Sequence, residues 1–379
     1  MTSPAPSISS HIVRDHEYYF EDGSTVFLIE NTLFKIHRSL LTSRSEVFRD
    51  MFELPSQPNT IGSTSVNTEG SSDGNPIVVP GVRAIQFRHL LLYFYGTITD
   101  PAYRSLILDA TDESEHSPDA FVRYLHIASL SHRFCFSSIE AWALAQLNRV
   151  LQSCNALADE IWTNTDDLLD ALAYSKLLAD RNTEHNVRSL IRCYIYHLII
   201  SPESGDKYEN DPKHLAQFYK RPRLKEEDSA LFGYVFCTVL RAHHTSAPWK
   251  HLSRDERSQL LAALVYLTPL PPTLPTNWIY DTFEISEEIN TQSRGGCFDD
   301  CAESFLDDFS NNVSCSNLES GLLRVGLVEL LDLADVRQVL AKKLRTAECT
   351  CAKQILEVVD LKINNLFAQM AEKYHNCLV

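Results

Sequence analysis

Ten cysteines are the first candidates for chemistry in this chain, at positions 135, 154, 193, 237, 297, 301, 315, 349, 351 and 377. Two close pairs, Cys297 with Cys301 and Cys349 with Cys351, raise the question of a zinc site. A closed zinc site needs four tetrahedral ligands, which usually come from two short-spaced pairs. Neither pair has the C-x2-C spacing, and no histidine follows closely. We interpret the cysteines as reduced thiols and expect no metal and no other cofactor.

Serines and histidines offer no better catalytic group. Gly70 to Gly74 (GSSDG) matches the G-x-S-x-G pattern of a nucleophile elbow, but polar residues flank it where an elbow needs a hydrophobic strand and a helix. His243, His244 and His251 lie in a polar, proline-flanked segment, which favours a loop or a helix end over a set of ligands. No phosphate-binding, dinucleotide-binding or H-E-x-x-H motif occurs. We predict that the chain is not an enzyme; the alternative is an active site in its C-terminal helical region.

The charge balance argues against nucleic acid as a direct partner. Lys and Arg number 34 against 50 Asp and Glu, which gives a formal net charge of −16 and repels a phosphate backbone. The one basic cluster is Lys220, Arg221, Arg223 and Lys225 (KRPRLK). As an exposed extended segment it could act as a nuclear-import signal; the alternative is solvated linker charge.

The sequence also predicts where the protein resides. The first ten residues lack the basic and apolar regions of a secretory signal. No run of about 18 uncharged apolar residues is present to span a membrane. We expect a soluble intracellular protein, cytoplasmic or nuclear, without a membrane partner.

The 379 residues are best divided into two main parts, and the first part mixes strands with helices. Residues 1–16 read as a disordered lead. Strand patterns follow at Tyr18–Phe20, Thr25–Ile29 and Leu33–Ile36, and a meander is their simplest arrangement. Two short helices between Arg38 and Phe52, with Ser43 to Ser45 as a cap between them, precede a polar segment, 55–76, that we expect to be a mobile insertion.

The first part continues with a strand, Ile77–Val79, and several helices. One of these helices begins near Ser137, with Glu140 completing a possible capping box. A small sheet covered by short helices, an α+β arrangement, is therefore expected up to residue 152.

The second part is mostly α-helical. Apolar residues recur at helical spacing through residues 153–267, and Ser253 with Glu256 forms a capping box. Residues 268–317 read as a proline-rich and then acidic connector, in which carboxylates could bind a divalent metal but more simply solvate a flexible segment. C-terminal helices follow in 318–379.

Several segments of the first part match one known family in order and spacing. In this family a strand ends in the pattern Phe-x-x-His, which is present here from Phe34 to His37, and an Asp-Gly turn, here Asp22 and Gly23, precedes it. The helical segment that follows matches at five apolar residues: Leu40, Leu41, Phe48, Met51 and Phe52. Residues 17–152 thus resemble a BTB/POZ domain, and the Glu-Asn-Thr-Leu-Phe-Lys strand is similar to the expanded BTB family of mushroom-type fungi.

This resemblance implies a small mixed sheet covered by short helices and a non-enzymatic role in protein–protein interaction. Such a protein could be a self-associating scaffold, with itself as partner in a homodimer, or a transcription-associated regulator. The alternative is a substrate adaptor that binds a cullin scaffold in a ubiquitin ligase, with the later helices as its extension. For His37 we expect a structural role, in which the imidazole hydrogen-bonds the backbone at the strand-to-helix turn while Phe34 enters the core.

Overall fold

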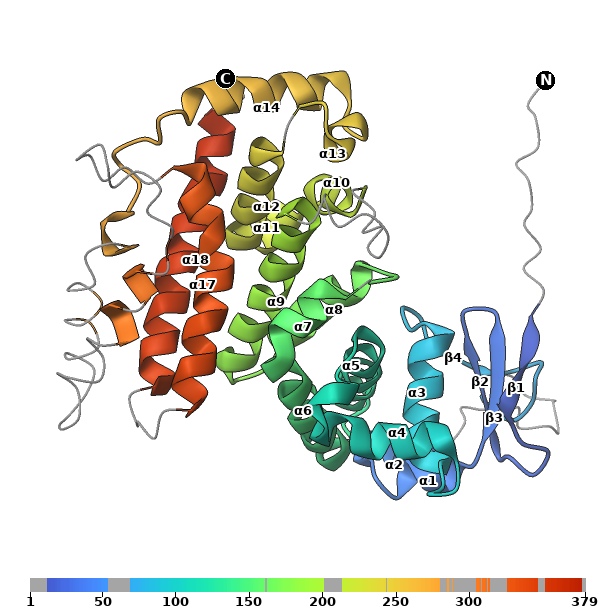
Figure 1. The fold of residues 1–379 in the computed structure, drawn as a ribbon. Coiled ribbons are helices and arrows are strands. Elements are labelled where there is room, and N and C mark those ends of the chain that lie inside the picture. The colour runs from blue at the N-terminus through green and yellow to red at the C-terminus, as the bar shows by residue number, and fades with distance from the viewer. Residues whose placement is uncertain are drawn as a thin grey trace, which may run out of the picture. The chain divides into compact units, whose positions relative to one another are not determined.

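The computed structural model describes residues 12–53, 69–160, 162–200, 213–242, 244–279, 285, 288, 305–307, 309–311, 313, 326–346 and 352–376. The chain divides into two compact units, Met1–Gln152 and Ser153–Val379. A small mixed four-stranded sheet with short helices forms the first unit, and a largely helical region follows it, with helix accounting for 70%. Figure 1 shows the elements of each unit.

The sheet of the first unit is not a meander. Its strands are β1 (Val13–Tyr19), β2 (Thr25–Ile29), β3 (Thr32–Ile36) and β4 (Ile77–Val78), in the spatial order β1-β3-β2-β4. Strands β2 and β3 form an antiparallel hairpin, β1 runs parallel to β3, and β4 runs parallel to β2. The expected meander was wrong because the local pattern of apolar residues identifies strands without specifying which neighbours pair.

Strand β1 begins at Val13, within the segment predicted to be a disordered lead. The sequence of this strand, VRDHEYY, is mostly polar, so it has no apolar pattern from which the whole strand could be predicted. Asp15 is buried because its carboxylate accepts hydrogen bonds from the backbone N–H of Tyr18 at 2.9 Å and from Arg88 Nε at 2.7 Å. Burial would raise the pKa of Asp15, but these bonds and the Arg88 charge hold it below the usual range.

Helices cover one face of this sheet. They are α1 (Arg38–Thr42), α2 (Glu46–Glu53), α3 (Ala84–Tyr95), α4 (Pro101–Leu108), α5 (Pro118–Arg133) and α6 (Ser137–Val150). Helix α3 lies along the sheet, where Phe87 contacts Phe27 and Phe34, and α5 packs beside α3 (Figure 1). This aromatic layer is the core of the first unit.

The helix starts in the first unit were predicted with mixed success. Ser45 Oγ accepts a hydrogen bond from the backbone N–H of Phe48 at 3.2 Å, so Ser45 caps α2 as expected. The capping box at Ser137 was wrong: no side-chain cap is present there. Glu140 instead contacts His132 Nδ1 at 2.8 Å. This contact with another helix takes the place of the bond to the backbone N–H of Ser137 that a capping box needs.

The second unit is built around α12. Its helices are α7 (Cys154–Asp159), α8 (Asp166–Ser175), α9 (Arg181–Ile200), α10 (Lys213–Lys220), α11 (Leu224–Glu227), α12 (Ser229–Arg241), α13 (Ala247–Lys250), α14 (Arg254–Tyr266), α17 (Leu327–Thr346) and α18 (Ala352–Asn376). Every residue of α12 from Ala230 to Leu240 is buried, as a helix that is apolar on all sides requires. Helix α12 lies beside α18 and α9 (Figure 1). Ser253 and Glu256 form the predicted capping box at the start of α14.

The two segments predicted to be loose are only partly described. Most of the insertion 55–76 lies outside the described residues, although Gly70 to Gly74 forms a turn. In the connector 268–317, seven of the described apolar side chains are buried: Leu274, Trp278, Ile279, Ile285, Leu306, Phe309 and Val313. Phe309 stacks on Trp278 with ring centroids 6.1 Å apart. At these positions the connector is packed rather than solvated, because its apolar residues lie between the acidic ones.

None of the helices in the described part of the chain is both long enough and apolar enough to cross a membrane.

Candidate functional site

The corner between β3 and α1 brings together the residues of the predicted signature. Phe34 is fully buried and its ring packs edge-on against Phe87 with centroids 5.1 Å apart. Three residues later the chain turns into α1, and His37 lies at this turn. Phe34 therefore enters the core, as expected.

At this corner the imidazole of His37 contacts side chains, not the backbone that we had expected. The Tyr95 hydroxyl accepts a hydrogen bond from the His37 backbone N–H at 2.9 Å and lies 2.9 Å from Nδ1. The Tyr95 hydroxyl can therefore donate its single proton to Nδ1. The imidazole then carries its own proton on Nε2 and can donate it to Asp22, 3.2 Å away. This hydrogen bond lowers the pKa of Asp22. The imidazole thus connects the β1–β2 turn to the end of α3.

Glycine is required beside Asp22. A Cβ atom at Gly23 would lie 2.8 Å from the carbonyl oxygen of Lys35, closer than real Cβ contacts come. The absence of a side chain lets the turn approach β3, which positions Asp22 for His37.

The apolar residues of the signature form the next layer. Phe48 is buried among Phe27, Phe52, Phe134 and Phe136. Leu41 is buried as well, whereas Leu40, Met51 and Phe52 are only half-buried. Ser45 joins this layer to the helix hairpin, because its hydroxyl donates to the carbonyl oxygen of Phe134 at 2.7 Å. The signature is therefore a packing unit that fixes α1 and α2 against the sheet and α5–α6.

The first unit also exposes surface that could bind another protein. Among the described residues, β1 pairs with one neighbour only, β3, so the other edge of this seven-residue strand has no strand beside it. Ile12 and Val13, at the start of this edge, are 55% and 53% exposed. Val47 on α2 is also exposed. An unpaired edge with apolar side chains is a template for strand addition.

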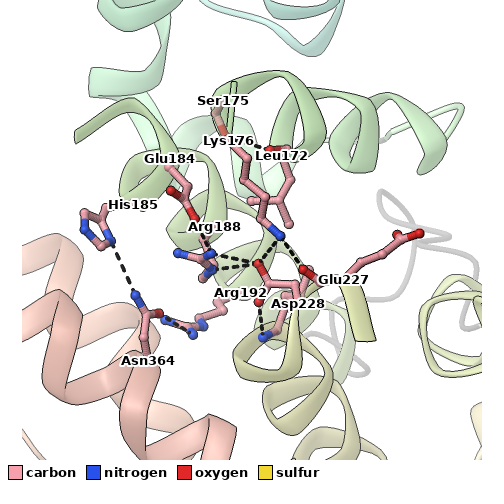
Figure 2. Close-up of polar contacts among 11 residues, drawn as sticks. Leu172, Ser175, Lys176, Glu184, His185, Arg188, Arg192, Glu227, Asp228 and Asn364 are labelled. Carbon is pink, nitrogen blue, oxygen red and sulfur yellow. Dashed lines mark hydrogen bonds and ion pairs between the residues drawn. The ribbon is translucent and has the colours of Figure 1, made fainter. Parts of the chain in front are cut away.

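The second unit holds a polar cluster that our reading of the sequence missed (Figure 2). Asp228 accepts hydrogen bonds from Arg188 Nη2 at 2.7 Å and from the backbone N–H of Leu231 at 2.8 Å, and it lies 2.9 Å from Lys176 Nζ. Arg188 also contacts Glu184 at 2.6 Å. Burial alone would raise the pKa of Asp228, but the charges of Arg188 and Lys176 lower it to about 2.

A second buried pair lies nearby. Arg337 donates to both carboxylate oxygens of Asp360, at 2.9 and 2.7 Å, and to Asn186 at 3.0 Å. Arg337 and Asp360 are both almost fully buried. Such bidentate pairs fix the helices that carry them, here α17 and α18.

Arg192 differs from the other two arginines because no carboxylate of the described residues contacts it directly. Its guanidinium donates to Asn364 Oδ1 at 2.8 Å and lies over the rings of Tyr234 and Phe367. Burial lowers the pKa of Arg192 to about 10, so it still carries a positive charge at neutral pH. One signal in the sequence could have revealed these arginines: Arg188 and Arg192 interrupt the apolar stripe of residues 187–198 at i, i+4 spacing.

The basic cluster is not an extended segment. Lys220 ends α10 and donates to the carbonyl oxygen of His251 at 2.6 Å, and Arg221 pairs with Asp166 at 2.6 Å. Arg223 is exposed in a left-handed turn. Lys225 belongs to α11, and its ammonium lies over Phe232 and Tyr374, where burial lowers its pKa. The cluster therefore forms a helical corner and not the extended segment that we expected, because apolar residues lie between the charges. Its role as a nuclear-import signal stays a prediction.

Of the four cysteines that the structure describes, Cys154 and Cys193 lie close enough to hydrogen-bond each other. Cys154, Cys193 and Cys237 are buried free thiols and Cys135 is exposed, while the other six lie outside the described residues. Burial raises the pKa of the Cys237 thiol. Within the described ranges, no three His, Cys, Asp or Glu side chains are placed to hold a metal ion.

No protein-family model matches this chain, and no curated protein or solved structure matches it either.

Proposed function

We propose that this chain is a non-enzymatic protein-interaction protein of the BTB/POZ type, whose first unit mediates self-association. The proposal rests on the resemblance of residues 17–152 and on one structural observation, the unpaired edge of β1. Addition of a strand from a second copy would satisfy the backbone groups along that edge and cover Ile12 and Val13. Buried free thiols in the second unit agree with an intracellular location, cytoplasmic or nuclear.

Light scattering of the full chain after size-exclusion chromatography tests this proposal. We expect a mass twice the 43.0 kDa of one chain at micromolar concentration. The double substitution Ile12→Lys with Val13→Lys places charge on the edge and should yield the mass of one chain. Val265→Lys, at a 79% exposed apolar residue of α14, is the matched control and should leave the mass unchanged. A wild-type chain that stays at 43.0 kDa rules out self-association.

The second candidate is an adaptor that binds a cullin scaffold. Val47, 48% exposed on α2, is the position at which we test this role, because a partner would bury its apolar side chain. A pull-down with a purified cullin scaffold should retain the wild-type chain and the control Val265→Asp, and lose Val47→Asp. Failure of the wild-type chain to be retained removes the adaptor role.

A further inference from the structure

The second unit contains a hollow that the first two residues of the basic cluster help to line. Its volume is about 630 Å³, which is within the range of small-molecule sites. The lining residues come from the start of α8, from one face of α10 and from the residue after α13. On α10, Lys213, Gln217 and Lys220 recur at helical spacing, and Arg221 follows directly after the helix. The fold therefore gathers the cations of one helix face around one hollow.

Cations outnumber carboxylates among the residues that line this hollow. Of those that the structure describes, Lys213, Lys220 and Arg221 carry positive charges, and Asp166 is the one carboxylate. Two further carboxylates lie close by: Glu256 is 3.5 Å from Lys220 Nζ, and Asp167 is buried in the first turn of α8. The lining is thus basic although the whole chain has a formal net charge of −16.

Arg221 is held at the start of α8 by an ion pair that leaves most of its guanidinium open. Its Nη1 contacts Asp166 Oδ1 at 2.6 Å, and its side chain forms no other hydrogen bond or ion pair with a described residue. The side chains of Arg221 and Asp166 are 41% and 54% exposed, and ion pairs that are exposed to water contribute little to stability. An anion that accepts hydrogen bonds from two N–H groups of Arg221 at once can therefore displace Asp166.

The start of α8 offers a further donor beside Arg221. Thr165, the N-cap residue, is only 9% exposed and lines the hollow, yet its hydroxyl does not cap the helix. Within the described ranges, this hydroxyl forms no hydrogen bond to any residue. The N-terminus of a helix also carries a partial positive charge, which Asp166 now partly neutralises together with that of Arg221. A guanidinium, a hydroxyl and a helix N-terminus are the groups with which proteins bind phosphate.

We propose that this hollow binds a phosphate monoester, whose phosphate replaces the Asp166 carboxylate on Arg221 and accepts a hydrogen bond from Thr165 Oγ1. A carboxylate ligand would only exchange one carboxylate for another, whereas a phosphate has three terminal oxygens for the donors of Arg221 and Thr165. A free monoester and a phosphoserine in a peptide share this chemistry. The inference concerns the second unit and does not depend on the function proposed for the first.

Isothermal titration calorimetry of the full chain tests the proposal with two probes, phenyl phosphate and acetyl-phosphoserine-amide. Saturable binding of either probe supports the proposal, and the tighter of the two distinguishes a free monoester from a phosphoserine in a peptide. Benzoate and acetyl-serine-amide, the matched compounds without a phosphate, should not bind. The absence of binding for both phosphates overturns the proposal, and so does binding of benzoate with the affinity of phenyl phosphate.

Three variants show whether the phosphate lies at Arg221. Arg221→Lys keeps the charge but removes the paired N–H donors, and it should weaken binding by about five- to tenfold. Asp166→Asn removes the competing carboxylate and should tighten binding by about three- to tenfold, a gain that a damaged fold would not produce. Arg223→Ala is the control, because Arg223 belongs to the same basic cluster but does not line the hollow, and it should bind like the wild type. An unchanged affinity of Arg221→Lys contradicts the proposal, as does a failure of Asp166→Asn to bind more tightly.

Discussion

Two side chains at the corner between β3 and α1 act in different ways. Phe34 contributes buried apolar area to the layer formed with Phe87, whereas His37 contributes directed hydrogen bonds to Tyr95 and Asp22. Packing is the larger of these contributions, since the Asp22 end of the hydrogen-bonded chain is exposed to water.

Phe34→Ala should destabilise the chain by about 3–5 kcal/mol, because it removes a fully buried ring and leaves a cavity. Urea denaturation of the full chain, followed by circular dichroism, measures this cost. Val47→Ala is the control and should change the free energy of unfolding by less than about 0.5 kcal/mol, because Val47 is half exposed. A cost for Phe34→Ala close to that of the control would contradict the role of Phe34 in the core.

Asp228 links the stability of the second unit to pH. Its pKa in the folded chain is about 2, below its usual value of 3.8, so folding favours the ionised form. The stabilisation is complete at pH values well above 3.8 and is lost as the pH falls through 3.8 toward 2. Asp228→Asn, which has no charge to lose, should therefore be less stable by about 3–5 kcal/mol at pH 7.

The difference between wild type and Asp228→Asn should narrow below about pH 4, in total by on the order of 2 kcal/mol, since one pKa unit corresponds to about 1.4 kcal/mol. Urea denaturation at a series of pH values from 7 to 2 measures it, and about half of the change should be present at pH 3. Asp255→Asn, at an exposed position in the first turn of α14, should show no comparable trend. If the difference in the free energy of unfolding between the wild type and Asp228→Asn stays constant down to pH 3, Asp228 keeps its usual pKa.

The polar residues of the second unit illustrate what the sequence could and could not predict at this scale. The roles of Phe34 and Phe48 as core residues follow from their types and spacing. Charged residues are usually solvated, so Arg188 and Lys225 read as surface residues. Their burial depends on partners about 40 residues away or more, such as Asp228 for Arg188 and Tyr374 for Lys225, and a single sequence does not reveal such pairs.

At the scale of elements, α12 and α18 approach each other closely at Gly233. A Cβ atom at Gly233 would lie 1.8 Å from the carbonyl oxygen of Phe367. Glycine normally weakens a helix by about 1 kcal/mol relative to alanine, so it is kept here because no side chain fits between the two backbones.

Gly233→Ala should therefore destabilise the chain, although the same substitution in an exposed helix stabilises it. The added Cβ would clash with backbone atoms of α18, at Phe367 and Ala371, so the two helices must separate. We expect the free energy of unfolding to fall by at least about 2 kcal/mol. Thermal unfolding of the full chain measures this. Gly74→Ala is the control, because a Cβ there has its nearest neighbour at 3.9 Å. An unchanged melting temperature for Gly233→Ala would show that α12 and α18 lie farther apart.

Helices were easier to predict from the sequence than the arrangement of strands. The apolar stripes of α9 and α18 are periodic over many residues, so the sequence indicates these helices directly. The strand order β1-β3-β2-β4 depends on pairing across the sheet, which local patterns do not specify. The two predicted capping boxes show that local patterns are reliable only where the bonds are local. Ser253 forms its bonds within one turn of helix, whereas Glu140 contacts His132 on another helix.

At the scale of the whole molecule, each unit has a hydrophobic core of its own. Phe27, Phe34 and Phe87 belong to the core of the first unit, and Tyr234 and Phe367 belong to that of the second. A unit that buries its own core can fold alone. The self-association proposed for the first unit would therefore not require the second unit.

We therefore expect residues 1–152 and residues 153–379, produced separately, each to unfold cooperatively in urea, and the sum of their circular dichroism spectra to reproduce that of the full chain. A third fragment, 153–241, is the control: it ends with α12 and lacks α18, so the buried faces of α12 lose their main partner. That fragment should bind a hydrophobic dye and unfold without a sharp transition. If residues 1–152 behave like the control, their core depends on the rest of the chain, and the first unit cannot act as an autonomous interaction module.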